Sequence, residues 1–380
     1  MPMNPHALKP AELARLMNST PLGETTSAPR VYRQRDQGGL RIGDGSTIDL
    51  IRYSAWLFHG WHERRADSRR EMSREERHRL DEAARSRARS ASARNIGPIP
   101  AIADLARRES CRRDLAKFIM TYSGEGKAPF SEDHLRVIRR IENAVFHGGR
   151  FVEAVFRGFG KTTISRAAAA WVLLYGHRRF VPIVGGTAAA AESNLDAIQG
   201  LFESSPLADD FPDVCHPILT LDGINQRAKG QLYETADGAA APTRVSWGKK
   251  LARLPMTDGA VDQDGVFHPN AAAGAVILSC GITSSEIRGL NKRRRDGLEL
   301  RPDFVILDDP QSDESAASGP QTDKRLDIIR KAILRSAGHA KGISVVMPCT
   351  VIRRGDLVDR LLDSAKNPTW QGERIPFVRK

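Results

Sequence analysis

The feature that most constrains the fold of this chain is a predicted strand, Phe151–Val155, that runs into a glycine-containing turn. The turn ends at Gly160, and Lys161-Thr162-Thr163 then opens an alanine-rich segment that predicts a helix. A strand, a turn ending in Gly-Lys-Thr and a helix, in this order, are the parts of a phosphate-binding loop. Backbone N–H groups at the start of such a helix point toward an anion, and the helix dipole favours negative charge there.

Each position of this loop has an expected task. Lys161 is expected to neutralise the β- and γ-phosphates of ATP, and the Thr162 hydroxyl is expected to coordinate Mg²⁺. Val155 occupies the position of the usual first glycine, so we expect Gly158 to provide the backbone freedom instead. The alternative is a chance Gly-Lys-Thr at the start of an unrelated helix. The loop residues predicted to contact the nucleotide are Arg157, Gly158, Phe159, Gly160, Lys161, Thr162 and Thr163.

Two carboxylates directly follow another apolar run. Phe304–Leu307 predicts a buried strand, and Asp308 and Asp309 come after it. A phosphate-binding loop needs an acid at the end of a neighbouring strand. We therefore expect Asp308 to hold the Mg²⁺ and Asp309 to orient and polarise the attacking water. The alternative is that both residues only cap the turn before Pro310.

The pattern around these motifs predicts an α/β fold. From residue 101 onward, helical patterns alternate with short apolar strands. Such alternation predicts a P-loop NTPase with a mainly parallel sheet and helices on both faces. The predicted helices are 115–122 and 134–146, and the predicted strands are 151–155, 180–184, 275–280, 304–307 and 343–347.

The charge balance indicates a polyanionic partner. The chain has 58 Lys and Arg against 46 Asp and Glu, a formal net charge of +12, which by itself does not separate nucleic acid from an acidic membrane. No run of about 18 apolar residues is present, so we expect no membrane-spanning helix. The N-terminus lacks the pattern of a signal peptide, and the four cysteines lack metal or disulfide spacing. We therefore expect a cytoplasmic location.

Residues 1–62 are predicted to form a small, mainly helical domain. Lys9–Met17, Arg30–Arg35 and Asp49–Phe58 predict three helices. The spacing of the glycines in Gly38–Ser46 is typical of a tight hairpin. Helix, turn, basic helix, hairpin and helix is the order of a winged helix-turn-helix, a DNA-binding fold. The alternative is a small structural domain that contacts only protein.

Residues 63–100 are predicted to be an Arg-rich helical linker to an ATPase domain over 101–380. Residues 63–94 contain 11 Arg and 7 acidic residues and almost no large apolar side chain, so they cannot form a core. Arg85–Arg94 is basic, and both a solvated linker and direct nucleic-acid contact are consistent with its composition. Asn95–Pro100 then ends the helical pattern.

Residues 110–380 resemble the ATPase motor of the large terminase subunits of tailed bacteriophages, which pump DNA into procapsids. The resemblance implies an enzyme that hydrolyses Mg²⁺-ATP and translocates double-stranded DNA. It also implies a homo-oligomeric ring when active, the phage portal and procapsid as partners, and the host cytoplasm as location. Residues 1–62 more faintly resemble the small terminase subunit, which is a further expected partner. The motor resemblance rests on Phe156–Thr163, Glu286–Leu290, Arg301–Pro310 and Cys349-Thr350.

The resemblance implies roles for four more positions. Arg288 matches an arginine finger that neutralises γ-phosphate charge in the adjacent ring subunit, with an ordinary surface arginine as the alternative. Arg157 matches a residue that senses the nucleotide, with loop support as the alternative. Thr350 stands where the family has a polar residue that senses hydrolysis. His134 stands in the adenine-contacting segment, where the family usually has Gln, and a simple position on a helix face is the alternative.

Two departures from the family change the expectations. Asp308-Asp309 replaces a common Asp-Glu pair, so the shorter Asp309 must approach the water more closely or act through an extra water. Glu314 is the alternative base. Only 30 residues follow Thr350, so we expect a motor without the family's nuclease domain.

Two other functions are consistent with the motifs. A DNA-binding recruitment protein would use residues 1–94 and carry a degenerate nucleotide site. A helicase or remodelling ATPase would need a second sheet domain, for which little length remains. The surface that grips DNA in a motor should be basic, and its candidates are Lys292–Arg295 and Lys249-Lys250.

Overall fold

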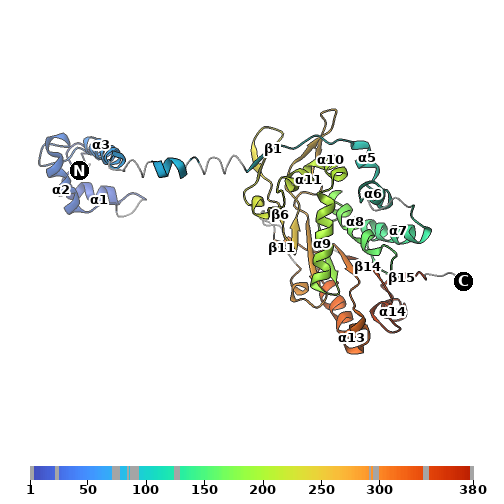
Figure 1. Ribbon diagram of the computed structural model, residues 1–380. Coiled ribbons are helices and arrows are strands. Elements are labelled where there is room, and N and C mark those ends of the chain that lie inside the picture. The colour runs from blue at the N-terminus through green and yellow to red at the C-terminus, as the bar shows by residue number, and fades with distance from the viewer. Residues whose placement is uncertain are drawn as a thin grey trace. The chain divides into compact units, whose positions relative to one another are not determined.

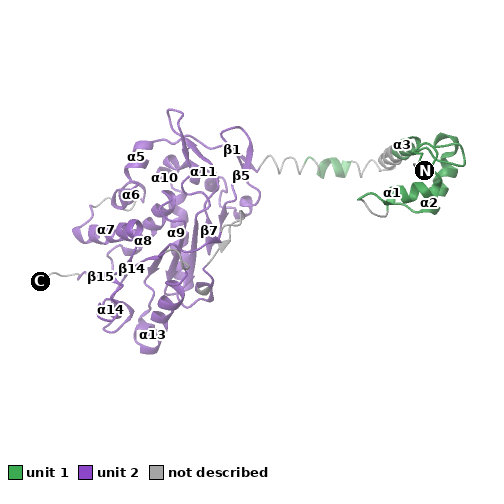
Figure 2. Cartoon of the chain, turned by 180° about the vertical axis from the view of Figure 1, so that it is seen from behind, with its two compact units in different colours: residues 1–90 green, residues 91–380 purple. Residues whose placement is uncertain are grey.

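The computed structural model describes residues 4–21, 25–70, 78–83, 85, 94–123, 129–290, 292–293, 299–336 and 342–376, with the backbone alone at 61–70, 288 and 292–293. The chain divides into two compact units, residues 1–90 and residues 91–380, which Figure 2 colours separately. Among the helices within these ranges, none is long and apolar enough to cross a membrane.

Unit 1 consists of helices around a small apolar core. Its elements are α1 (Pro10–Asn18), α2 (Ala28–Gly38), the 3-10 turn η1 (Gly39–Arg41) and α3 (Leu50–Arg70). This core includes one buried side chain from each α-helix: Leu13 of α1, Val31 of α2 and Tyr53 of α3. The three helices predicted for this region are confirmed. Helix α3 continues beyond residue 62, where the sequence patterns placed a boundary.

The prediction of a tight hairpin after α2 is wrong. The chain instead forms η1 and then a loop, which a single bridge between Gly43 and Ile48 closes. The Asp44 carboxylate accepts hydrogen bonds from the backbone N–H groups of Ser46 and Thr47 at 2.9 and 2.6 Å. These side-chain bonds occupy N–H groups that a hairpin ladder would use. Within its described residues, unit 1 therefore has no two-stranded wing.

Unit 2 alternates helices and strands along the chain. Its helices and helical turns are α5 (Leu105–Ser110), α6 (Leu115–Tyr122), α7 (Glu132–His147), α8 (Lys161–Leu174), α9 (Ala188–Phe202), α10 (Ser205–Asp210), α11 (Pro212–Leu219), η2 (Asn225–Ala228), η3 (Ser285–Gly289), α12 (Asp313–Ala316), α13 (Gly319–Ile328), η4 (Ile329–Ile333) and α14 (Leu357–Leu361). Its strands are β1 (Asn95–Pro98), β2 (Arg150–Ala154), β3 (Phe180–Gly185), β4 (Leu232–Glu234), β5 (Ala240–Pro242), β6 (Ser246–Trp247), β7 (Leu251–Arg253), β8 (Gly259–Val261), β9 (Phe267–Pro269), β10 (Val276–Gly281), β11 (Lys292–Arg293), β12 (Glu299–Leu300), β13 (Phe304–Asp308), β14 (Ser344–Cys349) and β15 (Gln371–Arg374).

An eight-stranded mixed sheet forms the centre of unit 2, in the order β15-β2-β14-β13-β3-β10-β7-β6. Neighbouring strands from β15 to β10 are parallel. Strands β7 and β6 continue the sheet in antiparallel pairing. All five strands predicted from apolar runs are present, as β2, β3, β10, β13 and β14. The α/β fold is therefore confirmed.

Alternate residues of the central strands face two separate apolar layers. Phe304 and Ile306 of β13 pack in the core that contains α6, α7, α8 and α9. Val305 and Leu307 pack in a second core with η4 and α14. Two-residue alternation between apolar faces is the pattern of a strand covered on both sides. Figure 1 shows α9 running along one face of this sheet.

Helix α8 is held deep in the first core. Trp171 is fully buried, and its Nε1 donates to the backbone carbonyl of Cys111 at 3.0 Å. Its ring also meets Phe146 edge-on at 5.6 Å between ring centroids. Lys161 is the first residue of α8, so the packing of Trp171 anchors the helix at whose start that lysine lies.

We expect Trp171→Ala to lower the free energy of unfolding by about 3–5 kcal/mol, because it leaves a large cavity in the core and removes the hydrogen bond to the Cys111 carbonyl. Urea denaturation followed by circular dichroism measures the change. Leu219→Ala is the control, because Leu219 is 42 % exposed, and it should change the free energy by less than about 1 kcal/mol. Equal effects of the two substitutions would contradict a central role for Trp171.

Candidate functional site

The predicted phosphate-binding loop joins β2 to α8. Gly158 and Gly160 have φ angles of +85° and +82°, in the left-handed region that glycine adopts without strain. Gly160 is the N-cap of α8. The N–H of Val155 donates to the Cys349 carbonyl at 2.9 Å, so this position continues the pairing of β2 with β14. The turn is thus made at Gly158 and Gly160, and a glycine is not required at Val155.

The Lys161 ammonium contacts residues that follow two other strands. Its Nζ lies 3.0 Å from Asp309 Oδ2 and donates to Thr350 Oγ1 at 3.1 Å. The Thr350 N–H donates to Asp309 Oδ1 at 3.1 Å, which closes a three-residue network. Because β14 lies between β2 and β13, Thr350 is placed between the loop after β2 and the acid after β13. The carboxyl ends of these parallel strands therefore form one site.

Thr162 faces the other acid of the pair. Its Oγ1 lies 3.4 Å from both carboxylate oxygens of Asp308. Asn194 of α9 donates to Asp308 Oδ2 at 2.9 Å, and Arg166 donates to Asn194 Oδ1 at 2.9 Å. The sequence patterns do not predict Asn194 as a site residue. Its one signal is an amide on the otherwise apolar buried face of α9, next to Leu195.

Asp308 is a buried acid whose charge depends on its neighbours. Burial raises its pKa above the ordinary value, and the negative charge of Asp309 acts in the same direction. The hydrogen bond from Asn194 and the charge of Lys161 lower the pKa. A cation beside Asp308 would further favour the ionised form.

Asp309 has a backbone conformation that is uncommon for a residue with a side chain. Its φ is +41°, which costs on the order of 1 kcal/mol. A Cβ at Gly186 would lie 2.9 Å from the Asp309 carbonyl oxygen, so the segments after β3 and β13 pass close together at this turn. The Asp309 side chain is 46 % exposed, in contrast to buried Asp308. The two acids therefore differ in their access to water.

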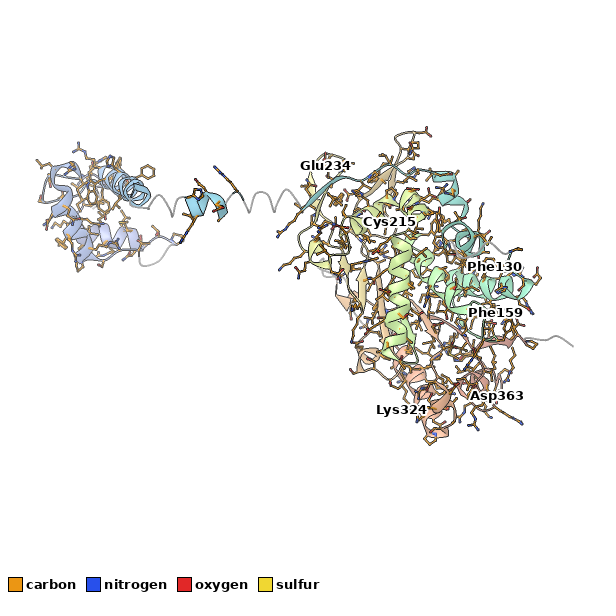
Figure 3. All side chains as sticks on the ribbon, in the orientation of Figure 1. Phe130, Phe159, Cys215, Glu234, Lys324 and Asp363 are labelled. Carbon is orange, nitrogen blue, oxygen red and sulfur yellow. The ribbon has the colours of Figure 1, made fainter. Side chains whose placement is uncertain are left out.

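His134 directly contacts the predicted phosphate-binding loop. Its ring stacks on Phe159 at 4.4 Å between ring centroids, and Nε2 lies 2.9 Å from the Phe159 carbonyl oxygen. Ser131 Oγ lies 2.6 Å from His134 Nδ1, and the Ser131 N–H donates to the same nitrogen at 3.2 Å. Phe130 and Phe159, which flank His134 in these ring contacts, are labelled in Figure 3. His134 therefore links α7 to the loop, and the predicted adenine contact stays a prediction.

The other predicted residues are less closely connected to this network. Arg157 Nη2 lies 3.4 Å from Asp313 Oδ1, with both side chains largely exposed. Thr163 lies in the first turn of α8. The backbone of Arg288 belongs to η3, and its side chain lies outside the described residues. The same is true of the side chains of the basic run 292–295.

A cavity of about 400 Å³ lies beside the predicted phosphate-binding loop. It combines apolar walls with three polar side chains at the ends of β2, β14 and β15. Its apolar lining includes Phe156, Val351, Ile375 and Pro376, and its polar lining is Arg157, Thr350 and Arg374.

A buried carboxylate lies in β2 just before the loop. Arg140 Nη1 donates to both oxygens of Glu153 at 2.7 and 2.8 Å. Burial raises the pKa of Glu153 to about 7, although the Arg140 bond acts in the opposite direction, and the charge of Glu373 raises it further. Arg140 Nη2 also lies 3.4 Å from Glu373, so these charges connect α7 with β2 and β15.

A scan against models of protein families finds no match for this chain, and a search of curated proteins finds none either. The functional assignment therefore depends on the sequence motifs and on the geometry of the site.

Glu153 predicts a pH dependence of stability. The folded chain holds the Glu153 proton up to about pH 7, whereas an ordinary Glu loses it near 4.5, so ionisation of Glu153 lowers stability as the pH rises through this window. Glu153→Gln removes this titration. Relative to the wild type, the free energy of unfolding of the variant should rise by roughly 3 kcal/mol between about pH 4.5 and pH 8.

Urea denaturation at both ends of this pH window tests the prediction. Glu132→Gln is the control, because Glu132 is an exposed glutamate on the same helix as Arg140. Its stability relative to the wild type should show no comparable pH dependence. Parallel pH curves for wild type and Glu153→Gln would contradict the raised pKa.

Proposed function

We propose that the chain is a Mg²⁺-dependent ATPase with a P-loop NTPase fold, of the type found in phage large terminase subunits, and that it translocates double-stranded DNA. The observation that carries the proposal is the meeting of Lys161, Asp309 and Thr350 at the ends of three adjacent parallel strands. Phosphoryl transfer depends mainly on positioned charges, and this network brings a cation, an acid and a hydroxyl together.

In this proposal the phosphates lie on the N-terminus of α8. The backbone N–H groups at the start of α8 point toward this position, and the helix dipole favours an anion there. Lys161 Nζ is within reach of the same position and would neutralise the β- and γ-phosphates. The left-handed glycines Gly158 and Gly160 let the loop backbone approach the phosphates without a side chain in the way.

The residues present fit a magnesium ion. Mg²⁺ prefers oxygen ligands, and the Thr162 hydroxyl and the Asp308 carboxylate lie 3.4 Å apart beside the phosphate position. Bound there, the metal would neutralise charge on the β- and γ-phosphates. Asn194 holds the Asp308 carboxylate in orientation from the other side, which reduces the freedom of this ligand.

Asp309 is the proposed base. It is the more exposed of the two acids and is held by the Thr350 N–H, so it can orient a water toward the γ-phosphate. Loss of the γ-phosphate would change the charge next to Lys161, and Thr350 would transmit that change into β14. His134, which contacts the loop at Phe159, is the proposed contact of the adenine base.

The DNA substrate and the larger assembly are parts of the same proposal. A net charge of +12 supports a polyanionic substrate, and the resemblance to terminase motors supports double-stranded DNA. The same resemblance supports a ring of identical subunits on the phage portal in the host cytoplasm, with a small terminase subunit as a further partner.

We expect Lys161→Ala and Asp309→Asn each to lower ATP hydrolysis by at least about 10²-fold, because they remove a phosphate contact and the base. Phosphate release measured with Mg²⁺-ATP and duplex DNA tests this prediction. Lys324→Ala is the matched control, because Lys324 is an exposed lysine on α13. Wild-type hydrolysis no faster than that of Lys161→Ala would contradict the motor and favour a DNA-recruitment protein with a degenerate site.

Arg288 tests whether the active site is shared between subunits. A ring subunit with Lys161→Ala can still offer Arg288 to its neighbour, and a subunit with Arg288→Ala can still bind ATP. Each variant alone should lose about 10³-fold in ATP hydrolysis, and a mixture of the two should recover part of it. A mixture that cross-links into joint assemblies on DNA and stays inactive would exclude an arginine finger that acts between subunits.

A further inference from the structure

A second concave surface lies at the β6 edge of the sheet in unit 2, and we call it the basic groove. Its volume is about 590 Å³. The segment from η2 to β4 forms one wall, and the segment from β5 to β6 forms the other. Figure 1 shows β6 and β1 on this side of unit 2. The lining residues used below are Lys229, Gly230, Arg244, Trp247 and Arg253.

The basic groove is separate from the candidate nucleotide site. Strands β13 and β6 are four steps apart in the sheet, roughly 19 Å at about 4.8 Å per step. Arg253 also pairs with Val276, the first residue of β10, whereas the phosphate-binding loop lies beyond the carboxyl ends of the parallel strands. One nucleotide cannot reach both places, so the groove would hold a different ligand.

The charge of the basic groove favours an anion. Lys229, Arg244 and Arg253 line it, and none of its described lining residues is Asp or Glu. Neighbouring cations are paired outside the lining, Arg227 with Asp222 at 3.2 Å and Lys250 with Glu286 at 3.4 Å. Positive charges that converge in a concave surface without acids raise the local concentration of anions.

Arg244 keeps a backbone conformation that glycine would adopt more easily. Its φ is +51°, and its side chain is exposed between β5 and β6. An exposed side chain gains little from packing, so packing does not explain an arginine at this strained position. A guanidinium that binds a ligand phosphate does explain it, because arginine matches phosphate oxygens with two parallel donors.

A polymer fits the groove better than a small anion. A Cβ at Gly230 would lie 3.4 Å from Arg94 Nη1, so the Arg94 guanidinium lies next to this glycine. Arg94 therefore adds a further positive charge beside the groove. Several arginines and lysines around one open surface are typical of contacts to a phosphate backbone.

We propose that the basic groove binds the phosphodiester backbone of double-stranded DNA. The choice of duplex DNA rests on the proposed function, whereas the anion site itself rests on the charges and the strain described above. Trp247, a buried residue of the lining, donates from Nε1 to Glu203 at 3.0 Å, and this bond fixes the orientation of its ring.

The test compares Lys229→Ala and Arg244→Gly in the full chain, with a labelled duplex of about 30 base pairs as the probe and fluorescence anisotropy at several salt concentrations. Each variant should bind about fivefold more weakly near 0.15 M salt, with a salt slope smaller by about 0.9 for each lost phosphate contact. Arg244→Gly should also keep or increase thermal stability, because glycine relieves the strained φ.

Lys324→Ala is the control for loss of one positive charge. Strand β4 follows the groove residues Lys229 and Gly230 in the chain, and Figure 3 shows Lys324 far from Glu234, the last residue of β4. The inference would be overturned if the groove variants bound the duplex with the same affinity and the same salt slope as Lys324→Ala. Hydrolysis of ATP without DNA is measured in parallel and should be unchanged in the groove variants. A wild-type chain that hydrolyses no ATP refutes the proposed function, while the anisotropy comparison still decides the groove.

Discussion

The parallel pairing of β14 with both β2 and β13 is the constraint on which the candidate site depends. It places the loop after β2, Thr350 after β14 and the acids after β13 side by side at one edge of the sheet. Lys161 can then lie 3.0 Å from Asp309 and 3.1 Å from Thr350, although the three residues are far apart in the sequence. A different strand order would separate the lysine from the acid by additional strand spacings.

The site concentrates unfavourable features that the surrounding fold must stabilise. Burial of Asp308 disfavours its charged form, and Asp309 has a positive φ. Glu153, near the end of β2, is also a buried acid. The two apolar cores on either side of the sheet provide the necessary stability. Such charges and strain cluster at functional sites because they hold reactive groups in fixed positions before the reaction. The two acids thereby acquire different environments from adjacent positions in the chain.

Short apolar runs in the sequence predicted the central strands well. Each of the strands β2, β3, β10, β13 and β14 comes from a short apolar run, because a strand covered on both faces must be apolar at consecutive positions. The hairpin after α2 was predicted wrongly, since side-chain hydrogen bonds from Asp44 replaced the strand pairing. Asn194 and the basic groove were not predicted at all. Both depend on which helix or loop faces which strand, and no local pattern records that arrangement.

The sequence by itself determined the glycine-containing turn between β2 and α8, the acidic pair after β13 and the α/β alternation, because each follows from residues close together in the chain. The tertiary structure decided that β14 lies between the two motifs, that Asn194 orients Asp308, and that Lys229 and Arg244 share one concave surface. These outcomes depend on strand order and on the packing of α9 against the sheet. Strand order is a global property, since it results from the burial of both sheet faces together, and a local window of sequence contains no information about it.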